Sequence, residues 1–300
     1  MRVELITDPA GWRRALDEVR SSGRNVGLVP TMGALHAGHL SLVRRAAAER
    51  DVVAVTDYVN PLQFSPSEDL VAYPRHVDRD AALAGDAGAR LVFAPTPERL
   101  WPEPAAATIT LRGIGDRLEG LSRPGHFGGV AVIVTKLFSL SGPCRAYFGE
   151  KDWQQTVVVR RVVSDLSLPV EVVGCPTVRD PDGLALSTRN AYLTEEERAV
   201  APTLYYALLA GRRLVESGET DPGAVGAAMA GVLGREPRFT LDYLEVAAPH
   251  DLSPLRRIAG EVRLLGAARL GRARLIDNIP ATSSHPPTGG DPRDRDDPRP

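Results

Sequence analysis

The stretch that decides the fold is NVGLVPTMGALHAGHL, residues 25–40. It begins with an apolar run, continues through a proline and two glycines, and carries two histidines near its end. A continuous apolar run is typical of a strand buried on both faces, and Leu40, Val43 and Ala47 then have helical spacing. A strand that passes through a glycine-containing turn into a helix is the opening unit of a doubly wound α/β sheet.

The chain repeats this alternation as far as residue 178. Further strands are predicted at 51–59, 89–95, 144–149 and 169–176, and helices at 12–19, 76–88, 129–142 and after Lys151. Because the strands are apolar runs separated by helices, they favour a parallel sheet covered on both faces. The predicted fold class is therefore α/β, with a doubly wound parallel sheet.

The regular alternation of apolar strands and helices ends after residue 178. A polar loop precedes two predicted helical stretches between 195 and 235, and strand-like segments follow at 239–247 and 273–279. This pattern predicts a first domain at 1–178 and a smaller α+β domain at 179–282. Residues 283–300 hold five prolines, four aspartates and three arginines, and no large apolar side chain. We expect them to form a disordered tail.

Composition excludes several classes of protein. The 300 residues carry a formal net charge of -2, without the basic excess of a nucleic-acid binder. No apolar stretch approaches the ~20 residues of a membrane span, and no charged leader precedes an apolar run, so a cytoplasmic protein is expected. The two cysteines, Cys144 and Cys175, favour neither a disulfide framework nor a zinc site.

The segment PTMGALHAGHL, residues 30–40, is the first candidate site. The carboxyl ends of parallel strands bind ligands where helix N-termini present amide hydrogens to anions. His36 and His39 are on one helical face there, and beside a phosphate chain they can donate hydrogen bonds as negative charge develops. The alternatives are that one histidine caps the helix while the other packs, or that the pair binds a metal. No third metal ligand with suitable spacing is nearby.

Two further segments follow strand ends at the same edge of the sheet. In YVNPLQF, residues 58–64, the amides of Asn60 and Gln63 can hold hydroxyls or a carboxylate, although Asn-Pro is also an ordinary turn signal. In FGEKDWQQ, residues 148–155, Lys151 is one of only two lysines among 36 basic residues. A lysine there can neutralise phosphate, whereas the alternative is a solvated first turn of a helix.

Two loops complete the set of motifs. DGLALSTRN, residues 182–190, offers Ser187, Thr188 and Arg189 to phosphate oxygens, or else caps the following helix. EGLSRPGHFGGV, residues 119–130, presents Arg123 and His126, or else anchors the helix after them. Asp80 is a speculative metal contact, and no residue is assigned as a metal ligand.

These motifs resemble the pantothenate synthetase (pantoate-β-alanine ligase) family. The resemblance runs in order through PTMGALHAGH, VNPLQF, YPR, EGLSRPGHFGGV, KLF, FGEKDWQQ, DGLALSTRN and RLIDN, and so covers almost the whole chain except the tail. It implies a Rossmann-like domain of the nucleotidyltransferase type, a C-terminal lid domain and a homodimer. The implied reaction joins (R)-pantoate to β-alanine through pantoyl adenylate, using ATP and Mg²⁺ and releasing AMP and pyrophosphate.

The resemblance also implies roles for residues. The catalytic set is His39, as proton donor, with His36, Lys151 and Arg189. The ATP-binding set is Met32, Gly33, His36, His39, Gly149, Glu150, Lys151, Asp152, Val178, Leu186, Ser187, Thr188 and Arg189. The set for pantoate and β-alanine is Gln63, Gln155, Asn60 and Arg123.

The chain departs from the family pattern in one charged position. Where many relatives read Ser-Ile-Phe, this chain reads Thr56, Asp57 and Tyr58, and Asp57 adds a charge near the edge of the sheet. Two other classes of function stay open: a nucleotidyltransferase that leaves the nucleotide on its product, and a noncatalytic nucleotide-binding protein. The paired glutamines and the STRN loop argue against the first, and the presence of His39, Lys151 and Arg189 argues against the second.

Overall fold

The computed structural model describes residues 3–64, 70–71 and 73–284. The chain divides into two compact units, Met1–Ala191 and Tyr192–Pro300. The sequence placed this boundary after residue 178. The loop that follows instead folds back within the first unit, because Arg179 bridges Ala185 and the Leu186 N–H donates to the Val178 carbonyl at 3.0 Å.

The first two residues of the predicted C-terminal tail, Ser283 and Ser284, lie within the described structure. Ser283 is buried, and its N–H donates to the Gly260 carbonyl at 2.8 Å, so it belongs to the packed structure. The rest of that prediction, residues 285–300, lies outside the described residues. No helix in the described part of the chain is long and apolar enough to span a membrane.

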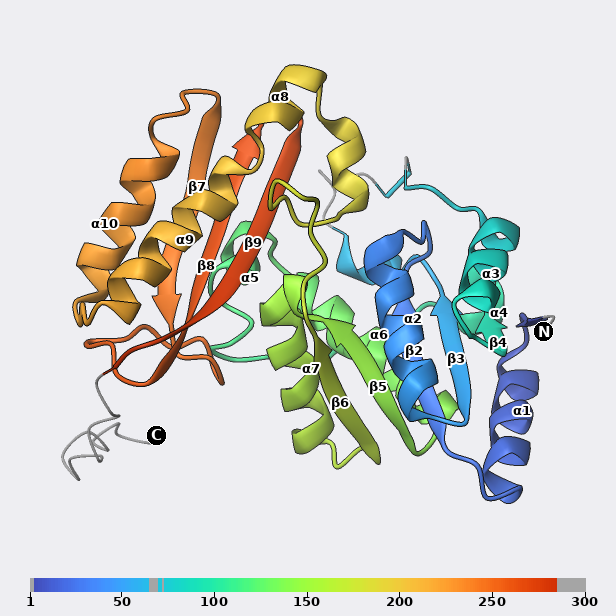
Figure 1. Ribbon diagram of the computed structural model, residues 1–300. Coiled ribbons are helices and arrows are strands. Elements are labelled where there is room, and N and C mark those ends of the chain that lie inside the picture. The colour runs from blue at the N-terminus through green and yellow to red at the C-terminus, as the bar shows by residue number, and fades with distance from the viewer. Residues whose placement is uncertain (1–2, 65–69, 72, 285–300) are drawn as a thin grey trace, which may run out of the picture. The chain divides into compact units, whose positions relative to one another are not determined.

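The first unit is built on a six-stranded parallel sheet (Figure 1). Its strands are β1 (Glu4–Ile6), β2 (Val26–Thr31), β3 (Val52–Asp57), β4 (Leu91–Phe93), β5 (Cys144–Gly149) and β6 (Val170–Cys175). Their spatial order is β1-β4-β3-β2-β5-β6. The apolar runs are buried, as expected for strands covered on both faces. The doubly wound α/β prediction is confirmed.

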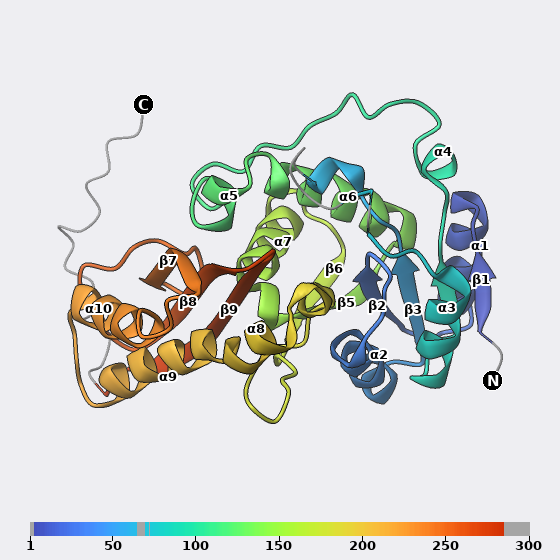
Figure 2. The same cartoon turned by 90° about the horizontal axis from the view of Figure 1, so that it is seen from above.

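Helices cover both faces of this sheet (Figure 2). They are α1 (Pro9–Ser21), α2 (Ala37–Glu49), α3 (Val77–Asp86), α4 (Pro97–Leu100), α6 (His126–Ser141) and α7 (Trp153–Asp165), and the one-turn helix α5 (Glu119–Ser122) precedes α6 in the chain. Apolar side chains of α1, α6 and α7 form one core with the sheet, and those of α2 and α3 form another. The sheet is therefore the middle layer of three.

The strand order reverses between β2 and β5. From β2 the chain proceeds to β3 and β4 on one side, and from β5 it proceeds to β6 on the other. Open parallel sheets bind ligands beyond the carboxyl ends of the strands at such a switch point. The turn after β2 leads into α2, and the short 3-10 helix η2 (Glu150–Asp152) follows β5. The two most polar motifs therefore flank the switch point.

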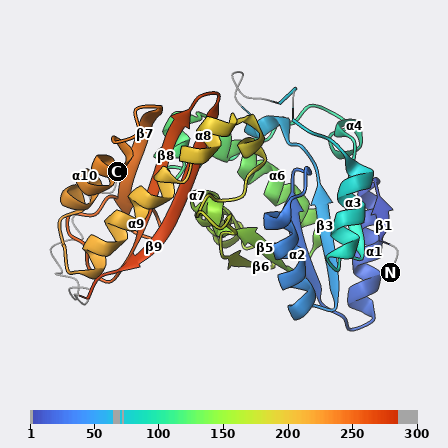
Figure 3. The same cartoon turned by 45° about the horizontal axis from the view of Figure 1, so that its top comes forward.

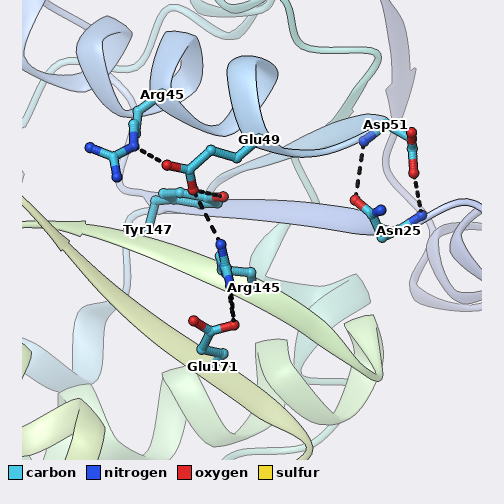
Figure 4. A network of polar contacts seen from close by, with 7 residues as sticks. All are labelled: Asn25, Arg45, Glu49, Asp51, Arg145, Tyr147 and Glu171. Carbon is cyan, nitrogen blue, oxygen red and sulfur yellow. Dashed lines mark hydrogen bonds and ion pairs between the residues drawn. The ribbon is translucent and has the colours of Figure 1, made fainter.

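A polar network ties the C-terminal end of α2 to the sheet (Figure 4). Glu49 accepts hydrogen bonds from Arg45 and from the Tyr147 hydroxyl, the latter at 2.9 Å. Arg145 lies 3.4 Å from Glu49 and 2.7 Å from Glu171 of β6. Because the network fixes one end of α2 against β5 and β6, it also fixes the position of the helix N-terminus.

The second unit is a three-stranded antiparallel sheet with helices packed on it (Figure 3). It comprises α8 (Glu195–Val200), α9 (Thr203–Glu216), α10 (Pro222–Leu233), β7 (Phe239–Ala247), β8 (Glu261–Leu270) and β9 (Ala273–Thr282). The predicted α+β character is confirmed. Residues 195–235 form three helices, where two helical stretches were predicted. The central strand β8 was not predicted.

Candidate active site

Both histidines of the first motif cap helix α2. His36 is the N-cap residue, and its Nδ1 accepts the Gly38 N–H at 3.1 Å. The His39 Nδ1 accepts the His36 N–H at 3.4 Å, and the ring centroids are 4.1 Å apart. The alternatives of capping and function therefore do not exclude each other. Capping fixes the orientation of both rings at the end of a helix that attracts anions.

The same hydrogen bonds determine which ring nitrogen carries the proton. Each Nδ1 accepts a backbone N–H, so each neutral imidazole carries its proton on Nε2. Burial and Lys151 lower the pKa of His36, although Asp152 opposes the shift. Burial and the neighbouring His36 lower the pKa of His39 to about 3. At neutral pH both side chains are therefore uncharged hydrogen-bond donors.

We expect His39 to stay neutral throughout mild acidification. Because its pKa lies below the 6.5 of an unfolded histidine, its contribution to stability is complete above pH 6.5 and is lost as pH falls toward 3. The expected loss from this residue is roughly 1 to 2 kcal/mol between pH 7 and pH 5. Histidine NMR shifts from pH 8 to pH 5 test this, with the urea-unfolded chain as control. A His39 midpoint near 6.5 in the folded protein would contradict the geometry.

Lys151 and Asp152 follow strand β5 on the other side of the switch point. Lys151 Nζ lies 3.6 Å from Asp152 Oδ1. Desolvation would raise the pKa of Asp152, but Lys151, Arg189 and Arg123 outweigh it and lower that pKa. The Asp152 side chain is 48% exposed, so this carboxylate faces solvent beside Lys151. The negative charge of Asp152 is therefore balanced by cations of three of the predicted motifs.

The loop of residues 182–190, DGLALSTRN, also reaches helix α2, through Leu186. A Cβ at Gly38 would lie 3.9 Å from the Leu186 Cβ. The Ser187 Oγ accepts the Arg189 N–H at 3.2 Å, which orders the start of the 3-10 helix η3 (Thr188–Tyr192). Thr188 is the first residue of η3. The Val178 carbonyl accepts a backbone hydrogen bond from Leu186.

Three other predicted site residues of the motif FGEKDWQQ, which follows β5, are Gly149, Glu150 and Gln155. At Gly149 a Cβ would meet nothing within 4 Å, and the φ of -75° suits any residue, so the turn itself does not require glycine. The space above Gly149 is what the glycine preserves. The Glu150 carboxylate lies against Gly174 of β6, 3.1 Å from the position of a Cβ there. Gln155 is in the first turn of α7 and is half-buried.

Asn60, predicted to bind substrate, holds the side chain of Gln63 in this structure. Asn60 is 1% exposed, and its Nδ2 donates to Gln63 Oε1 at 3.0 Å and to the Gly129 carbonyl at 3.1 Å. Its Oδ1 accepts the Leu62 N–H as the cap of the 3-10 helix η1 (Pro61–Gln63). The Gln63 Nε2 is thereby directed to Met32 Sδ, 3.0 Å away.

Arg123 and His126 fix the main chain of Gln63. His126 Nδ1 lies 2.8 Å from the Gln63 carbonyl oxygen and Arg123 Nη2 lies 3.4 Å from it, while Arg123 Nη1 is 3.0 Å from His126 Nε2. The arrangement requires a neutral His126 that donates through Nδ1 and accepts through Nε2. A Cβ at Gly129 would overlap the Leu62 carbonyl, so α6 can approach η1 only at a glycine.

Two positioning residues were missed or misassigned from sequence. Gln154, next to the predicted Gln155, accepts the Glu119 N–H at 3.1 Å and donates to the carbonyls of Ile114 and Arg117. Asp80 is buried and accepts the N–H groups of the turn before α2 at 2.7 and 2.9 Å. The metal contact suggested for Asp80 is thus replaced by a backbone contact. The sequence signal for Gln154 was its position in the Gln-Gln pair that ends the motif FGEKDWQQ.

The described residues contain no group of three or more histidine, cysteine, aspartate or glutamate side chains able to hold a metal.

A parallel sheet with a histidine-capped helix N-terminus and a lysine at its switch point is the arrangement at which α/β proteins bind anionic ligands such as nucleotide phosphates. The family model for pantoate-beta-alanine ligase matches residues 4–280. This chain therefore belongs to the pantoate-β-alanine ligase family.

Individual relatives agree over nearly the whole chain. A pantothenate synthetase of Rhizobium etli is 48% identical over 266 residues, which are 89% of this chain and 90% of that protein. One of Cereibacter sphaeroides is 50% identical over 271 residues, covering 90% and 97%. The crystal structure of pantothenate synthetase from Thermus thermophilus has a TM-score of 0.87 at 48% identity, covering 92% of this chain and 99% of that one.

A more distant structure carries ligands. The pantoate-β-alanine ligase of Francisella tularensis, complexed with β-γ ATP and β-alanine, has a TM-score of 0.75 at 30% identity. It covers 92% of this chain and 97% of its own. The fold at the switch point is therefore shared with a relative that binds both molecules.

Proposed function

We propose that this chain joins (R)-pantoate to β-alanine with ATP, through pantoyl adenylate, at the switch point of its parallel sheet. The observation that carries the proposal is the pair of histidines that cap the N-terminus of α2 after β2, with the Lys151–Asp152 pair after β5 on the other side of the switch point. Family membership supplies the reaction, and the geometry supplies the groups that it needs.

In the first step the pantoate carboxylate attacks the α-phosphorus of ATP, and pyrophosphate leaves. This step needs alignment and charge neutralisation more than a protein nucleophile. The Nε2–H groups of His36 and His39 donate hydrogen bonds to phosphate oxygens, while Lys151 and Arg189 balance the growing charge. A pKa of about 3 makes His39 a hydrogen-bond donor rather than a source of protons at neutral pH.

The amides of Gln63 and Gln155 hold pantoate in this proposal. Asn60 fixes the Gln63 side-chain oxygen, and one hydrogen of the Gln63 Nε2 is directed to Met32 Sδ, so its second hydrogen donates to an oxygen of the substrate. In the second step the free amine of β-alanine attacks the acyl carbon of the adenylate, and AMP leaves. Exclusion of water protects the adenylate between the steps.

Other parts of the proposal come from the family resemblance. The second unit acts as a lid, the protein is a homodimer, and it works in the cytoplasm. Mg²⁺ enters as the counter-ion of the ATP phosphates. The backbone around Gly149 and Val178 and the hydroxyls of Ser187 and Thr188 complete the nucleotide site.

Product analysis tests the proposed function. We expect AMP and pantothenate to form in equal amounts only when ATP, (R)-pantoate and β-alanine are all present. Chromatography of the nucleotides measures this directly. A product that retains AMP after β-alanine is added would instead indicate a nucleotidyltransferase, and the absence of any pantoate-dependent turnover would reject the proposal.

A further inference from the structure

Asp57 ends strand β3 and lies against the turn that precedes α2. It is paired with Thr31 in the β2–β3 register, and its side chain is 8% exposed. A Cβ at position 33 would overlap the Asp57 Oδ1, and Gly33 has a φ of +78°, so glycine is required there for two reasons. Asp57 is thus in contact with the proposed ATP-binding turn.

Two carboxyl groups meet at this turn. Asp80 on α3 accepts the N–H groups of Ala34 and Leu35, at 2.7 and 2.9 Å. Its Oδ2 lies 3.2 Å from the position of a Gly33 Cβ, close to Asp57. The Asp57 Oδ2 is buried and has no hydrogen-bond partner among the described residues. Asp57 is therefore the less stabilised carboxylate of the pair.

The surroundings of Asp57 favour its neutral form. From α3 it faces the negative Asp80, and from the turn it faces Thr31 and Gly33, which carry no charge. Burial and Asp80 raise the pKa of Asp57 to about 6. A triphosphate bound at this turn would add negative charge nearby and raise that pKa further.

We propose that Asp57 couples ATP binding to the uptake of about one proton. This proton resides on the Asp57 carboxyl group while ATP is bound. The inference rests on the proposed function of the Met32–His39 turn. The proton comes from solvent and takes no part in adenylyl transfer. ATP binding consequently weakens as pH rises from 6 to 8, because the free protein must then take up a proton in order to bind.

Calorimetric titration with ATP and MgCl₂, in two buffers of different ionisation enthalpy, tests the proposal. For the wild type at pH 8 we expect uptake that approaches one proton per ATP and a dissociation constant roughly fiftyfold weaker than at pH 6. Asp57→Asn should take up fewer protons and lose most of this pH dependence. Asp78→Asn removes an exposed charge from the first turn of α3, the helix that carries Asp80, and should behave like the wild type.

Three results would overturn the coupling. They are equal proton uptake by the wild type and Asp57→Asn, the same loss of pH dependence in Asp78→Asn, and wild-type binding at pH 8 without proton uptake. The last measurement needs no variant, so it decides the matter even when Asp57→Asn does not fold. Tight ATP binding that does not change with pH would reject the proton coupling but not the proposed function. A complete absence of ATP binding would reject both.

Discussion

His39→Ala is expected to slow adenylate formation by about 10²- to 10³-fold, which corresponds to the loss of one preorganised donor to the transition state. The reason is geometric. The His39 Nδ1 is held by the His36 N–H, so its Nε2–H has a fixed direction at the N-terminus of α2. The rate of pyrophosphate release in a single turnover measures the effect. The affinity for ATP should change much less than the rate.

Two control variants separate catalysis from helix capping in this experiment. His39→Gln keeps an acceptor for the His36 N–H and a donor amide, so we expect it to recover part of the lost rate. His76→Ala removes another histidine from a helix N-terminus, one that makes no capping hydrogen bond, and should leave the rate unchanged. A His39→Ala protein with near-normal turnover would contradict the assigned role.

Lys151→Met is expected to reduce pyrophosphate release by at least about 10²-fold, because it removes a cation from a site where phosphate charge grows. It should also raise the pKa of His36, since Lys151 contributes to lowering it. NMR titration of His36 therefore gives a second readout that does not depend on turnover.

The other lysine provides a matched control. Lys136 on α6 lies over the Trp101 ring, with its Nζ 3.6 Å from the ring centroid. Lys136→Met removes the same chemical group from a different place and should preserve the rate and the His36 titration. Equal losses of activity in the two methionine variants would show that Lys151 has no special place in the reaction.

The sequence predicted the parallel sheet because buried parallel strands are continuous apolar runs, and those of β2, β3 and β5 are easily recognised. It also predicted that the histidine and lysine motifs share one edge of the sheet, since both follow strand ends. Strand β8 was missed, because EVRLLGAARL mixes small and charged residues and has only one β-branched side chain, Val262.

Contacts between distant segments were harder to predict. The role of Asn60 depends on Gly129, 69 residues away, and that of Asp80 depends on backbone amides that precede α2. A polar side chain in a motif can either face the substrate or hold a neighbour that does. Only the folded chain distinguishes the two, since the same amide or carboxylate satisfies both patterns.

The central claim is that groups from separate segments act on one ATP molecule to activate pantoate. Exchange of labelled pyrophosphate into ATP, measured with pantoate present and β-alanine absent, tests it most directly. We expect rapid exchange that requires pantoate in the wild type and is reduced by at least about 10²-fold in both His39→Ala and Lys151→Met. Wild-type exchange that proceeds equally well without pantoate, or none at all with it, would contradict the account.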